Sequence, residues 1–326
     1  MIHRIRDLNP ATYGRHPIHA ADRVWSETNC YVDVVAELLH GLGLEPLAAL
    51  PFTLSVDFEG DQWTFFKFAP ADILELYALH INELNPWREL VLHVEEQVAR
   101  GRPVLVELDS FYLPDTHGSA YKIAHVKSTV AVNAIDVGER WLGYFHGQGY
   151  HELRGDDFEQ IFQTDGLVHE RMLPPYIEYV KPVDEPRPSS RPELHEASLR
   201  CLRRHLALVP RANPFHAFER RFREDLAWLQ AGPIETFHNY AFATFRQYGA
   251  CFELLATYLR WLADGGERCL EPAIDAFTRV STGAKTLQFQ LARAIARGND
   301  VPLGPLTEMA TLWERGVATV ADRYGG

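Results

Sequence analysis

The stretch Trp25-Ser-Glu-Thr-Asn-Cys30, which continues as Tyr31-Val-Asp-Val-Val-Ala-Glu-Leu-Leu-His40, decides the fold of the N-terminal half. Thr28 and Asn29 are both good helix N-caps, so the pattern predicts a helix with Cys30 in its first turn. Apolar residues then recur at helical spacing, which predicts a buried face that holds this turn in place: Val34, Val35, Leu38, Leu39 and Leu42.

Cys30 is a candidate nucleophile because of this position. Backbone N–H groups and the dipole at a helix start favour negative charge, and therefore the thiolate form. The alternative is an ordinary buried cysteine, which is the more common environment of a single cysteine. His125 favours the interpretation of Cys30 as a nucleophile, because this histidine begins an apolar, strand-like run over 125–135. In thiol catalysis the thiolate attacks an acyl carbon, and an imidazolium protonates the leaving group.

The composition limits the classes of protein to which the chain could belong. With 326 residues, 46% of them hydrophobic, the chain has enough apolar side chains for two domains. The net charge of −12 argues against a nucleic-acid partner, because no basic excess is present to neutralise phosphates. We find neither an apolar signal-peptide core nor a run of transmembrane length, and expect a cytoplasmic protein with no membrane partner. Four cysteines without paired spacing suggest neither a disulfide framework nor a zinc site: Cys30, Cys201, Cys251 and Cys269.

The first half alternates between helix-like and strand-like patterns. Residues 51–58 and 62–68 predict a β-hairpin, and 70–80 and 86–98 predict helices. Strands are then predicted over 103–109, 125–135 and 139–146, followed by a short helix over 155–162 and an edge strand over 176–180. The tight turn at 136–138 makes the second and third strands antiparallel neighbours.

A proline-rich linker at 182–192 divides the chain. It predicts an α+β domain over 1–181 and an all-helical domain over 193–326. Within the second domain we expect five helices: 193–208, 214–230, 234–264, 267–298 and 305–323.

A third polar group must orient the imidazole of His125. Asp136, in the turn after the histidine strand, is the better electrostatic partner, whereas His146, near the end of the next strand, has the better strand position. The sequence leaves both open. Asp109 ends the preceding strand and either lines the site or caps the strand end.

The oxyanion of the reaction needs hydrogen-bond donors, and the backbone N–H of Cys30 with the side chain of Asn29 are the candidates. A metal site is the alternative for the histidines, but their spacing matches no familiar ligand pattern, so no metal is expected. These histidines are His117, His125, His146 and His151.

Several motifs together carry a resemblance to known families: Asn29-Cys30 at a helix start, Gly101-Arg-Pro-Val-Leu-Val-Glu-Leu-Asp109-Ser-Phe-Tyr112-Leu-Pro-Asp115, His125 leading an apolar strand, and Tyr144-Phe-His-Gly-Gln-Gly-Tyr150. They resemble the butirosin-biosynthesis H-type acyltransferases over residues 24–165, and more closely the bacterial domain-of-unknown-function family 1839 over the whole chain. One departure is that no Asp-Pro follows the histidine strand.

The resemblance implies a papain-like fold, a nucleophile helix on an antiparallel sheet, that transfers an acyl or aminoacyl group. The donor would be the phosphopantetheine thioester of a carrier protein, the acceptor a small amine, and the enzyme would need no cofactor of its own. Tyr112 would line the site. A cysteine peptidase or amidase on the same core, and a non-catalytic carrier-binding protein, are the alternatives.

The helical region is expected to pack over the open side of the Cys30–His125 cleft, because a thioester must be shielded from water if an amine is to attack. Arg246 or Lys285 would face an anionic or carbonyl group there. The acyl pocket would be lined by Phe242, Phe245, Tyr248 and Phe289.

Overall fold

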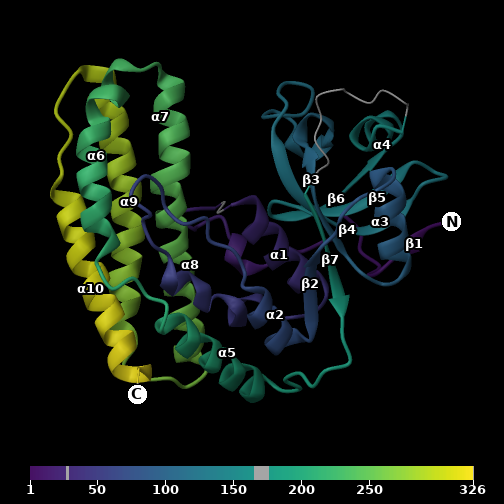
Figure 1. Cartoon of the computed structure of the whole chain (residues 1–326), viewed down its shortest axis with the longest axis horizontal. Coiled ribbons are helices and arrows are strands. Elements are labelled where there is room, and N and C mark those ends of the chain that lie inside the picture. The colour runs from purple at the N-terminus through teal and green to yellow at the C-terminus, as the bar shows by residue number, and fades with distance from the viewer. Residues whose placement is uncertain (27–28, 165–175, 326) are drawn as a thin grey trace. The chain divides into compact units, whose positions relative to one another are not determined.

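The computed structural model describes residues 1–26, 29–164 and 176–325 and shows an α+β protein (Figure 1). The chain forms two compact units that interleave along the sequence. The sheet unit contains Met1–His19, Asn29–Pro46 and Ile73–Arg187. The helical unit contains Ala20–Thr28, Leu47–Asp72 and Pro188–Gly326.

The sheet unit is built on a seven-stranded antiparallel sheet of order β2-β7-β3-β4-β5-β6, with the short β1 pairing with the end of β4. The three predicted central strands are confirmed, as is the antiparallel pairing across the 136–138 turn. The strands are β1 (His3–Arg4), β2 (Leu79–Glu83), β3 (Val104–Asp109), β4 (Lys127–Asp136), β5 (Trp141–His146), β6 (Gly149–Arg154) and β7 (Ile177–Pro182).

Several assignments in the sheet unit differ from the sequence prediction. The strand predicted at the sheet edge, β7, lies between β2 and β3, because β2 pairs with its outer side. The helix predicted to reach residue 80 ends earlier: α2 (Pro70–Tyr77) stops before Ala78, whose φ of 53° is left-handed, and the chain then enters β2. Strand β6 was not predicted.

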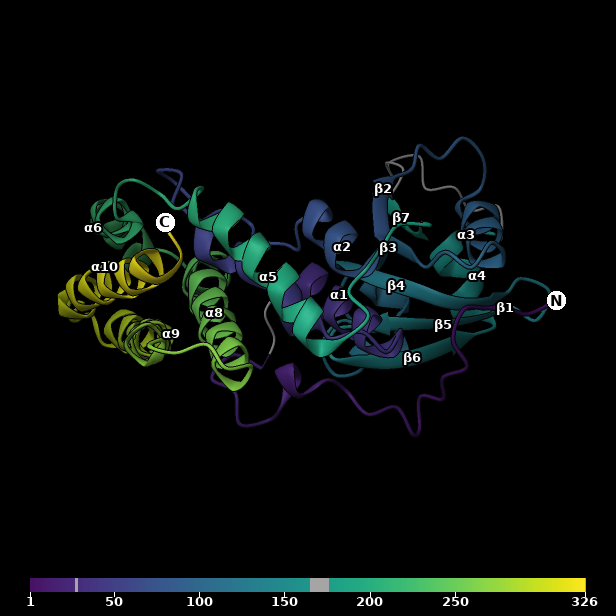
Figure 2. The same cartoon turned by 90° about the horizontal axis from the view of Figure 1, so that it is seen from below.

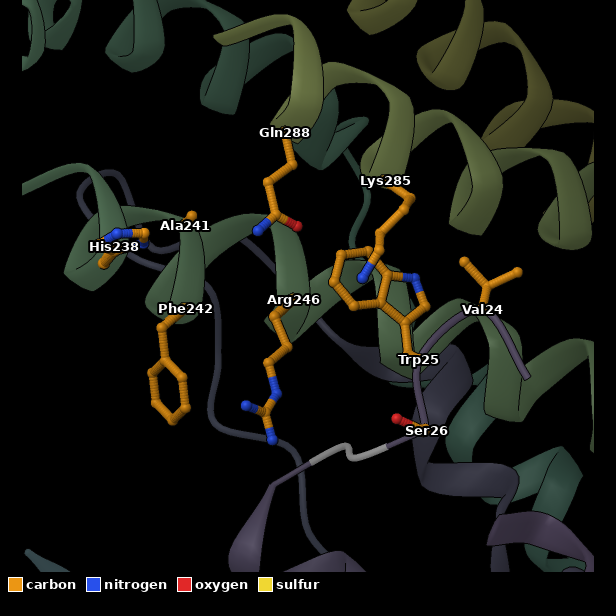
Figure 3. Close-up of a pocket in the computed structure, with 9 residues that line it drawn as sticks. All are labelled: Val24, Trp25, Ser26, His238, Ala241, Phe242, Arg246, Lys285 and Gln288. Carbon is orange, nitrogen blue, oxygen red and sulfur yellow. The ribbon is translucent and has the colours of Figure 1, made fainter. Parts of the chain in front are cut away.

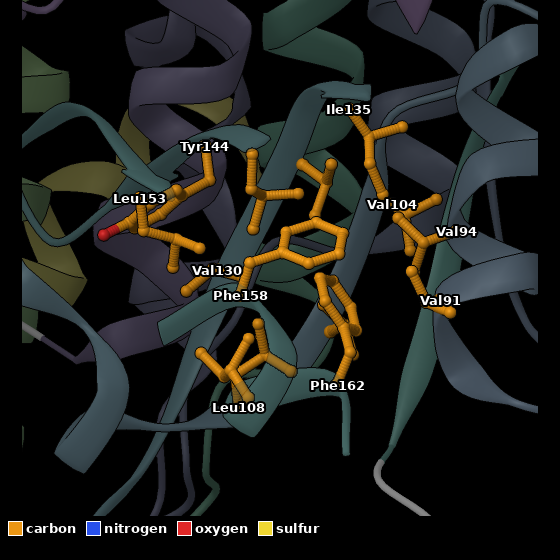
Figure 4. Packing of buried hydrophobic residues seen from close by; sticks show 14 of the residues in the cluster. Val91, Val94, Val104, Leu108, Val130, Ile135, Tyr144, Leu153, Phe158 and Phe162 are labelled. Carbon is orange, nitrogen blue, oxygen red and sulfur yellow. The ribbon is translucent and has the colours of Figure 1, made fainter. Parts of the chain in front are cut away.

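The central strand β4 is buried on both faces. Helix α1 (Cys30–Gly41) packs against one face, and the hydrophobic cluster of the other face includes residues of α3 (Leu90–Ala99) and α4 (Asp156–Phe162). Figure 4 shows this cluster, in which Val130 of β4 and Tyr144 of β5 lie with Phe158 of α4. On the α1 side, a Cβ added to Gly41 would lie 2.5 Å from Phe145 Cζ, so only glycine permits this close approach.

The helical unit is confirmed as all-helical after residue 190. Helices α8, α9 and α10 lie side by side in both views (Figures 1 and 2). The predicted helix over 234–264 is divided by a π-helical turn, η6 (Phe242–Arg246). The helices are α5 (Arg191–Leu206), α6 (Pro214–Ala231), α7 (Ile234–Ala241), α8 (Gln247–Asp264), α9 (Glu271–Arg297) and α10 (Gly304–Tyr324).

The predicted hairpin over 51–68 is wrong. The segment forms a 3₁₀ helix, η3 (Pro51–Ser55), and a single bridge between Phe58 and Trp63. Its aromatic side chains pack against the helices instead of facing a partner strand. Trp63 has ring-centroid distances of 4.8 Å to Tyr248 and 5.2 Å to Phe215. The remaining 3₁₀ helices are η1 (Pro17–His19), η2 (Pro46–Ala49), η4 (Ser110–Tyr112) and η5 (Pro114–Thr116).

Two acidic residues of α1 bind side chains of the N-terminal segment of the sheet unit. Glu37, which is fully buried, lies 2.5 Å from His19 Nδ1 and accepts the Tyr13 hydroxyl at 2.5 Å. Asp33 lies 3.3 Å from His19 Nε2. Burial would lower the pKa of His19, but the bonds and charges of Asp33 and Glu37 outweigh it and raise the pKa to about 9.

This network predicts a pH-dependent stability. The pKa of His19 is about 9 in the folded chain and about 6.5 when unfolded. The stabilisation is therefore fully present below pH 6.5 and is lost as pH rises through 9. In urea denaturation, the contribution of His19 to the free energy of unfolding should be smaller at pH 9.5 than at pH 6, by on the order of 3 kcal/mol. His19→Gln should flatten this dependence, whereas His80→Gln, at an exposed position of β2, should not. Equal slopes in the three proteins would contradict it.

Candidate active site

Cys30 is the first residue of α1, as predicted. Asn29 is the N-cap: its side-chain oxygen accepts the backbone N–H of Val32 at 2.9 Å, and the residue is buried. Capping fixes the start of the helix and thus the direction of the Cys30 side chain. The role of Asn29 as an oxyanion donor stays a prediction. The other cap candidate, Thr28, lies outside the described residues.

The thiol of Cys30 faces β4. Its Sγ lies 3.5 Å from the Thr129 hydroxyl, and the residue is partly exposed. Thr129 stands opposite Glu107 of β3 in the strand register, and Lys127 Nζ lies 2.7 Å from the Glu107 carboxylate. Alternate residues of a strand share a face. The sheet face beside Cys30 is therefore polar and charged toward the beginning of β4.

His125 and Asp109 form a pair at that end of the sheet. His125 Nδ1 lies 2.6 Å from Asp109 Oδ2, while Asp109 Oδ1 accepts the backbone N–H of Phe111 at 3.0 Å. The imidazole stacks on the Phe111 ring at 4.4 Å, with Tyr112 at 6.3 Å. Asp109 thus orients His125, as a carboxylate orients the histidine of a catalytic triad.

Cys30 and His125 do not touch. Within the described part of the chain, no hydrogen bond joins the two side chains. His125 precedes β4 by two residues instead of starting it, and its side chain is 66% exposed. The strand was predicted to begin at His125 but begins two residues later, so His125 lies on the preceding loop.

Neither predicted third residue lies beside His125. Asp136 ends β4, accepts the Glu139 backbone N–H at 3.1 Å and faces the N-terminal ammonium at 3.4 Å. Seven residues of strand separate it from Thr129, roughly 23 Å at 3.3 Å per residue. His146 bonds to Ser128, the neighbour of Thr129, whose side chain points to the opposite face of the sheet. Asp109 is the carboxylate that pairs with His125.

A second polar cluster surrounds His146. Its Nε2 lies 2.6 Å from Ser128 Oγ, and its Nδ1 lies 2.5 Å from Asp115 Oδ2. Tyr144 donates its hydroxyl to Asp115 at 2.6 Å, and His151 Nε2 is 4.0 Å from the same carboxylate. Burial would raise the pKa of Asp115, but the hydrogen bond and charge of His146 outweigh it and lower that pKa.

Sequence reasoning missed Ser128 and Asp115 as site candidates. Asp115 ends the motif that begins at Gly101, but no catalytic role was predicted for it. The available signal was the strand register: Ser128 and His146 lie on neighbouring strands, and Val130 pairs with His146. Residues two apart on a strand share a face, so Ser128 and His146 are diagonal neighbours. We find no group of three or more His, Cys, Asp or Glu residues suited to a metal among residues 1–26, 29–164 and 176–325.

The two predicted site-lining cations belong to the helical unit. Arg246 and Lys285 line one cavity there, of about 310 Å³, together with Phe242 and Trp25 (Figure 3). Phe245 and Tyr248, predicted for an acyl pocket, are fully buried in the core of the unit. Phe289 is exposed, and its ring centroid lies 5.9 Å from Lys285 Nζ. The expectation that this region covers Cys30 stays a prediction.

Comparison with family models identifies the chain. The DUF1839 N-terminal domain matches residues 14–182, and the DUF1839 C-terminal domain matches residues 191–322. The chain belongs to the DUF1839 family. No curated protein matches this DUF1839 chain. Among its described helices, none combines the length and apolar character needed to cross a bilayer.

Cysteine accessibility leads to a prediction for this DUF1839 chain. Cys201 and Cys251 are fully buried, and burial raises the pKa of Cys251 well above its usual value. Iodoacetamide should therefore modify only Cys30 and Cys269 in the folded protein, and Cys30 faster, as expected of a nucleophile at the start of α1. Peptide mass spectrometry at short reaction times measures both rates. Faster modification of the exposed Cys269 would argue against an activated thiol at Cys30.

Proposed function

We propose that the protein is a thiol-dependent acyltransferase that moves an acyl or aminoacyl group from a carrier-protein thioester to a small amine. The proposal rests on one observation: Cys30 begins α1 with its thiol against Thr129 of β4, and the oriented His125–Asp109 pair lies beyond the beginning of that strand. A nucleophile at a helix start and a carboxylate-bound imidazole are the two components that acyl transfer through a thiol requires.

The papain-like assignment is part of the proposal. Helix α1 packed on an antiparallel sheet, with a histidine from the sheet side, supports it. The motif resemblance to butirosin-biosynthesis H-type acyltransferases supports the choice of donor and acceptor. In this assignment Asp109 takes the part of the third residue, in place of Asp136 or His146.

The reaction would proceed in two steps. The Cys30 thiolate attacks the thioester carbon, a bond to Sγ forms, and the carrier sulfur leaves with a proton from the His125 imidazolium. The amine then attacks the acyl-enzyme, gives its proton to His125 as the bond to Sγ breaks, and the amide is released. Asp109 bonds to the imidazole through Nδ1 and orients it.

This mechanism requires His125 to approach Cys30. His125 lies on the loop before β4 and is mostly exposed, so substrate binding can reorient it without breaking the sheet. Catalytic hydrogen bonds are often long before the substrate binds and tighten in the complex.

Cys30→Ala should abolish transfer, by about three orders of magnitude or more, because it removes the nucleophile. Cys269→Ala, which removes an exposed thiol, should leave the rate unchanged. Loss of thioester absorbance, followed with an acyl-carrier donor in the presence and absence of an amine, measures both transfer and hydrolysis. Equal rates with and without amine would favour a cysteine hydrolase. Undiminished turnover by the Cys30→Ala variant would reject the thiol mechanism.

A second candidate function, serine-type ester or amide hydrolysis, is favoured by the Ser128–His146–Asp115 cluster. In this cluster the serine lies on His146 Nε2 and the carboxylate on Nδ1, the order of a Ser-His-Asp triad. Ser128 is 8% exposed, so only a narrow acyl group would reach its hydroxyl.

A small fluorophosphonate tests this second candidate. If Ser128 is a nucleophile, peptide mapping should find the reagent there, and Ser128→Ala and His146→Gln should each abolish labelling. Ser119→Ala, at an exposed serine, serves as the control. If the wild-type chain stays unlabelled while Ser128→Ala lowers its unfolding midpoint, the cluster is a structural hydrogen-bond network.

A further inference from the structure

The hydroxyl of Thr129 is directed at the thiol of Cys30. Its Oγ lies 3.5 Å from Cys30 Sγ, and no other residue in the described parts of the chain hydrogen-bonds to this side chain. Thr129 is only 6% exposed, so water has little access to the hydroxyl. A buried hydroxyl normally has a hydrogen-bond partner in the protein. The thiol of Cys30 is therefore the group that satisfies this hydroxyl.

Two rigid elements hold the thiol and the hydroxyl in place. Thr129 lies within β4 (Lys127–Asp136), where it pairs with Glu107 of β3 in the antiparallel register. The β-branched side chain of a threonine has few χ1 rotamers. Cys30 is the first residue of α1, whose start is fixed by the Asn29 cap and which packs against β4. The distance between the two side chains is thus set by secondary structure and does not depend on a loop.

The backbone N–H of Cys30 is a second donor near the same sulfur. The first N–H groups of a helix have no partner within the helix. The side-chain oxygen of Asn29 accepts the N–H of Val32, whereas none of the hydrogen bonds between described residues uses the N–H of Cys30. A hydroxyl from β4 and an N–H from α1 therefore both lie near the nucleophile.

The charges next to Thr129 in the strand register are balanced. Glu107 lies opposite Thr129, and its carboxylate alone would oppose negative charge that develops there. Lys127 Nζ lies 2.7 Å from that carboxylate. Lys127 precedes Thr129 by two residues, so the two side chains share one face of the sheet. An anion beside the Thr129 hydroxyl therefore meets a paired carboxylate and a cation.

We propose that Thr129 is a catalytic residue, whose hydroxyl donates a hydrogen bond to the oxyanion that forms on the thioester carbonyl, a role that depends on the acyl transfer proposed for Cys30. In this step a bond forms between Sγ and the carbonyl carbon, and an electron pair of the C=O bond moves onto the oxygen. When the C=O bond re-forms, the carrier sulfur leaves with a proton from His125. The oxyanion is then two bonds from Sγ, and donors beside the sulfur can reach it.

A hydroxyl suits this role because its hydrogen can rotate. A thiolate only accepts hydrogen bonds, so Thr129 is the donor when Cys30 is ionised. During the attack the negative charge passes from the sulfur to the carbonyl oxygen, and rotation about the Cβ–Oγ bond lets the same hydroxyl follow it. In a site with little water, a donor aimed at developing charge stabilises the transition state more than the ground state.

Two reactions of the same thiol in the full chain test this role. Acylation of Cys30 by a short-chain acyl-pantetheine thioester forms an oxyanion, whereas alkylation by iodoacetamide displaces iodide and forms none. Thr129→Val should lower the acylation rate by about 10²–10³-fold, the loss typical of one oxyanion donor, and lower the alkylation rate far less. Thr129→Ser, which keeps a hydroxyl, should restore most of the acylation rate. Thr311→Val, at an exposed position of α10, is the matched control and should change neither rate.

Peptide mass spectrometry follows both modifications of Cys30. Equal acylation of the wild-type and Thr129→Val chains would overturn the role of Thr129 and leave the proposed function intact. A fall in both rates by the same factor would also overturn it, because the hydroxyl would then act on the thiol alone. A wild-type chain that is alkylated but never acylated would reject the proposed function, and this role with it. Thermal unfolding shows whether each variant is folded, and Thr129→Ala, with the same expected loss, replaces a Thr129→Val chain that is not.

Discussion

The burial of β4 on both faces is the constraint on which the sheet unit depends. A strand buried on both sides needs a covering layer on each, and α1 provides one while α3 and α4 provide the other. Side chains of successive residues point to opposite faces. Thr129 therefore meets the Cys30 thiol while its neighbour Ser128 meets His146 on the other side. These two adjacent residues of β4 therefore belong to two different polar clusters, one on each face of the sheet.

The helical unit depends on a different interaction, the packing of aromatic rings contributed by distant parts of the sequence. Trp63, from the segment before α2, lies among Phe215, Phe218 and Tyr248 of the helices. Trp25, from the segment before α1, lies against Gly249 of α8. Aromatic side chains bury large areas and prefer tilted or edge-on contacts. These contacts place two segments of the N-terminal half in the helical unit.

Much of the secondary structure could be predicted because its signals are local. Helical spacing and proline or glycine ends located the helices after residue 190, and Asn29 located the start of α1. The hairpin prediction at 51–68 was wrong because alternation reports burial of every second side chain, and burial against helices gives the same pattern as burial in a sheet. The place of β7 in the sheet depends on pairing with β2 nearly a hundred residues earlier, which no local pattern encodes.

The candidate site was also predictable only where its signals were local. The position of Cys30 follows from capping, and Asp109 was named near His125 because it ends the adjacent strand. Asp136 fails as the partner because it ends the extended strand β4, at the end away from His125. The antiparallel turn brings His146 back to the beginning of β4, but it bonds to Ser128, on the face opposite to Thr129 and Cys30. The π-helical turn at 242–246 was not predictable, because an inserted residue leaves the helical apolar pattern nearly intact.

In the proposed mechanism, Cys30 carries the acyl group during turnover. The most direct measurement is intact-protein and peptide mass spectrometry after brief mixing with a short-chain acyl-pantetheine thioester and no amine. The peptide that contains Cys30 should then carry one acyl group per chain, which hydroxylamine releases and which prior alkylation of that thiol prevents. An acyl group on Ser128, or an unmodified chain while thioester is consumed, would contradict it.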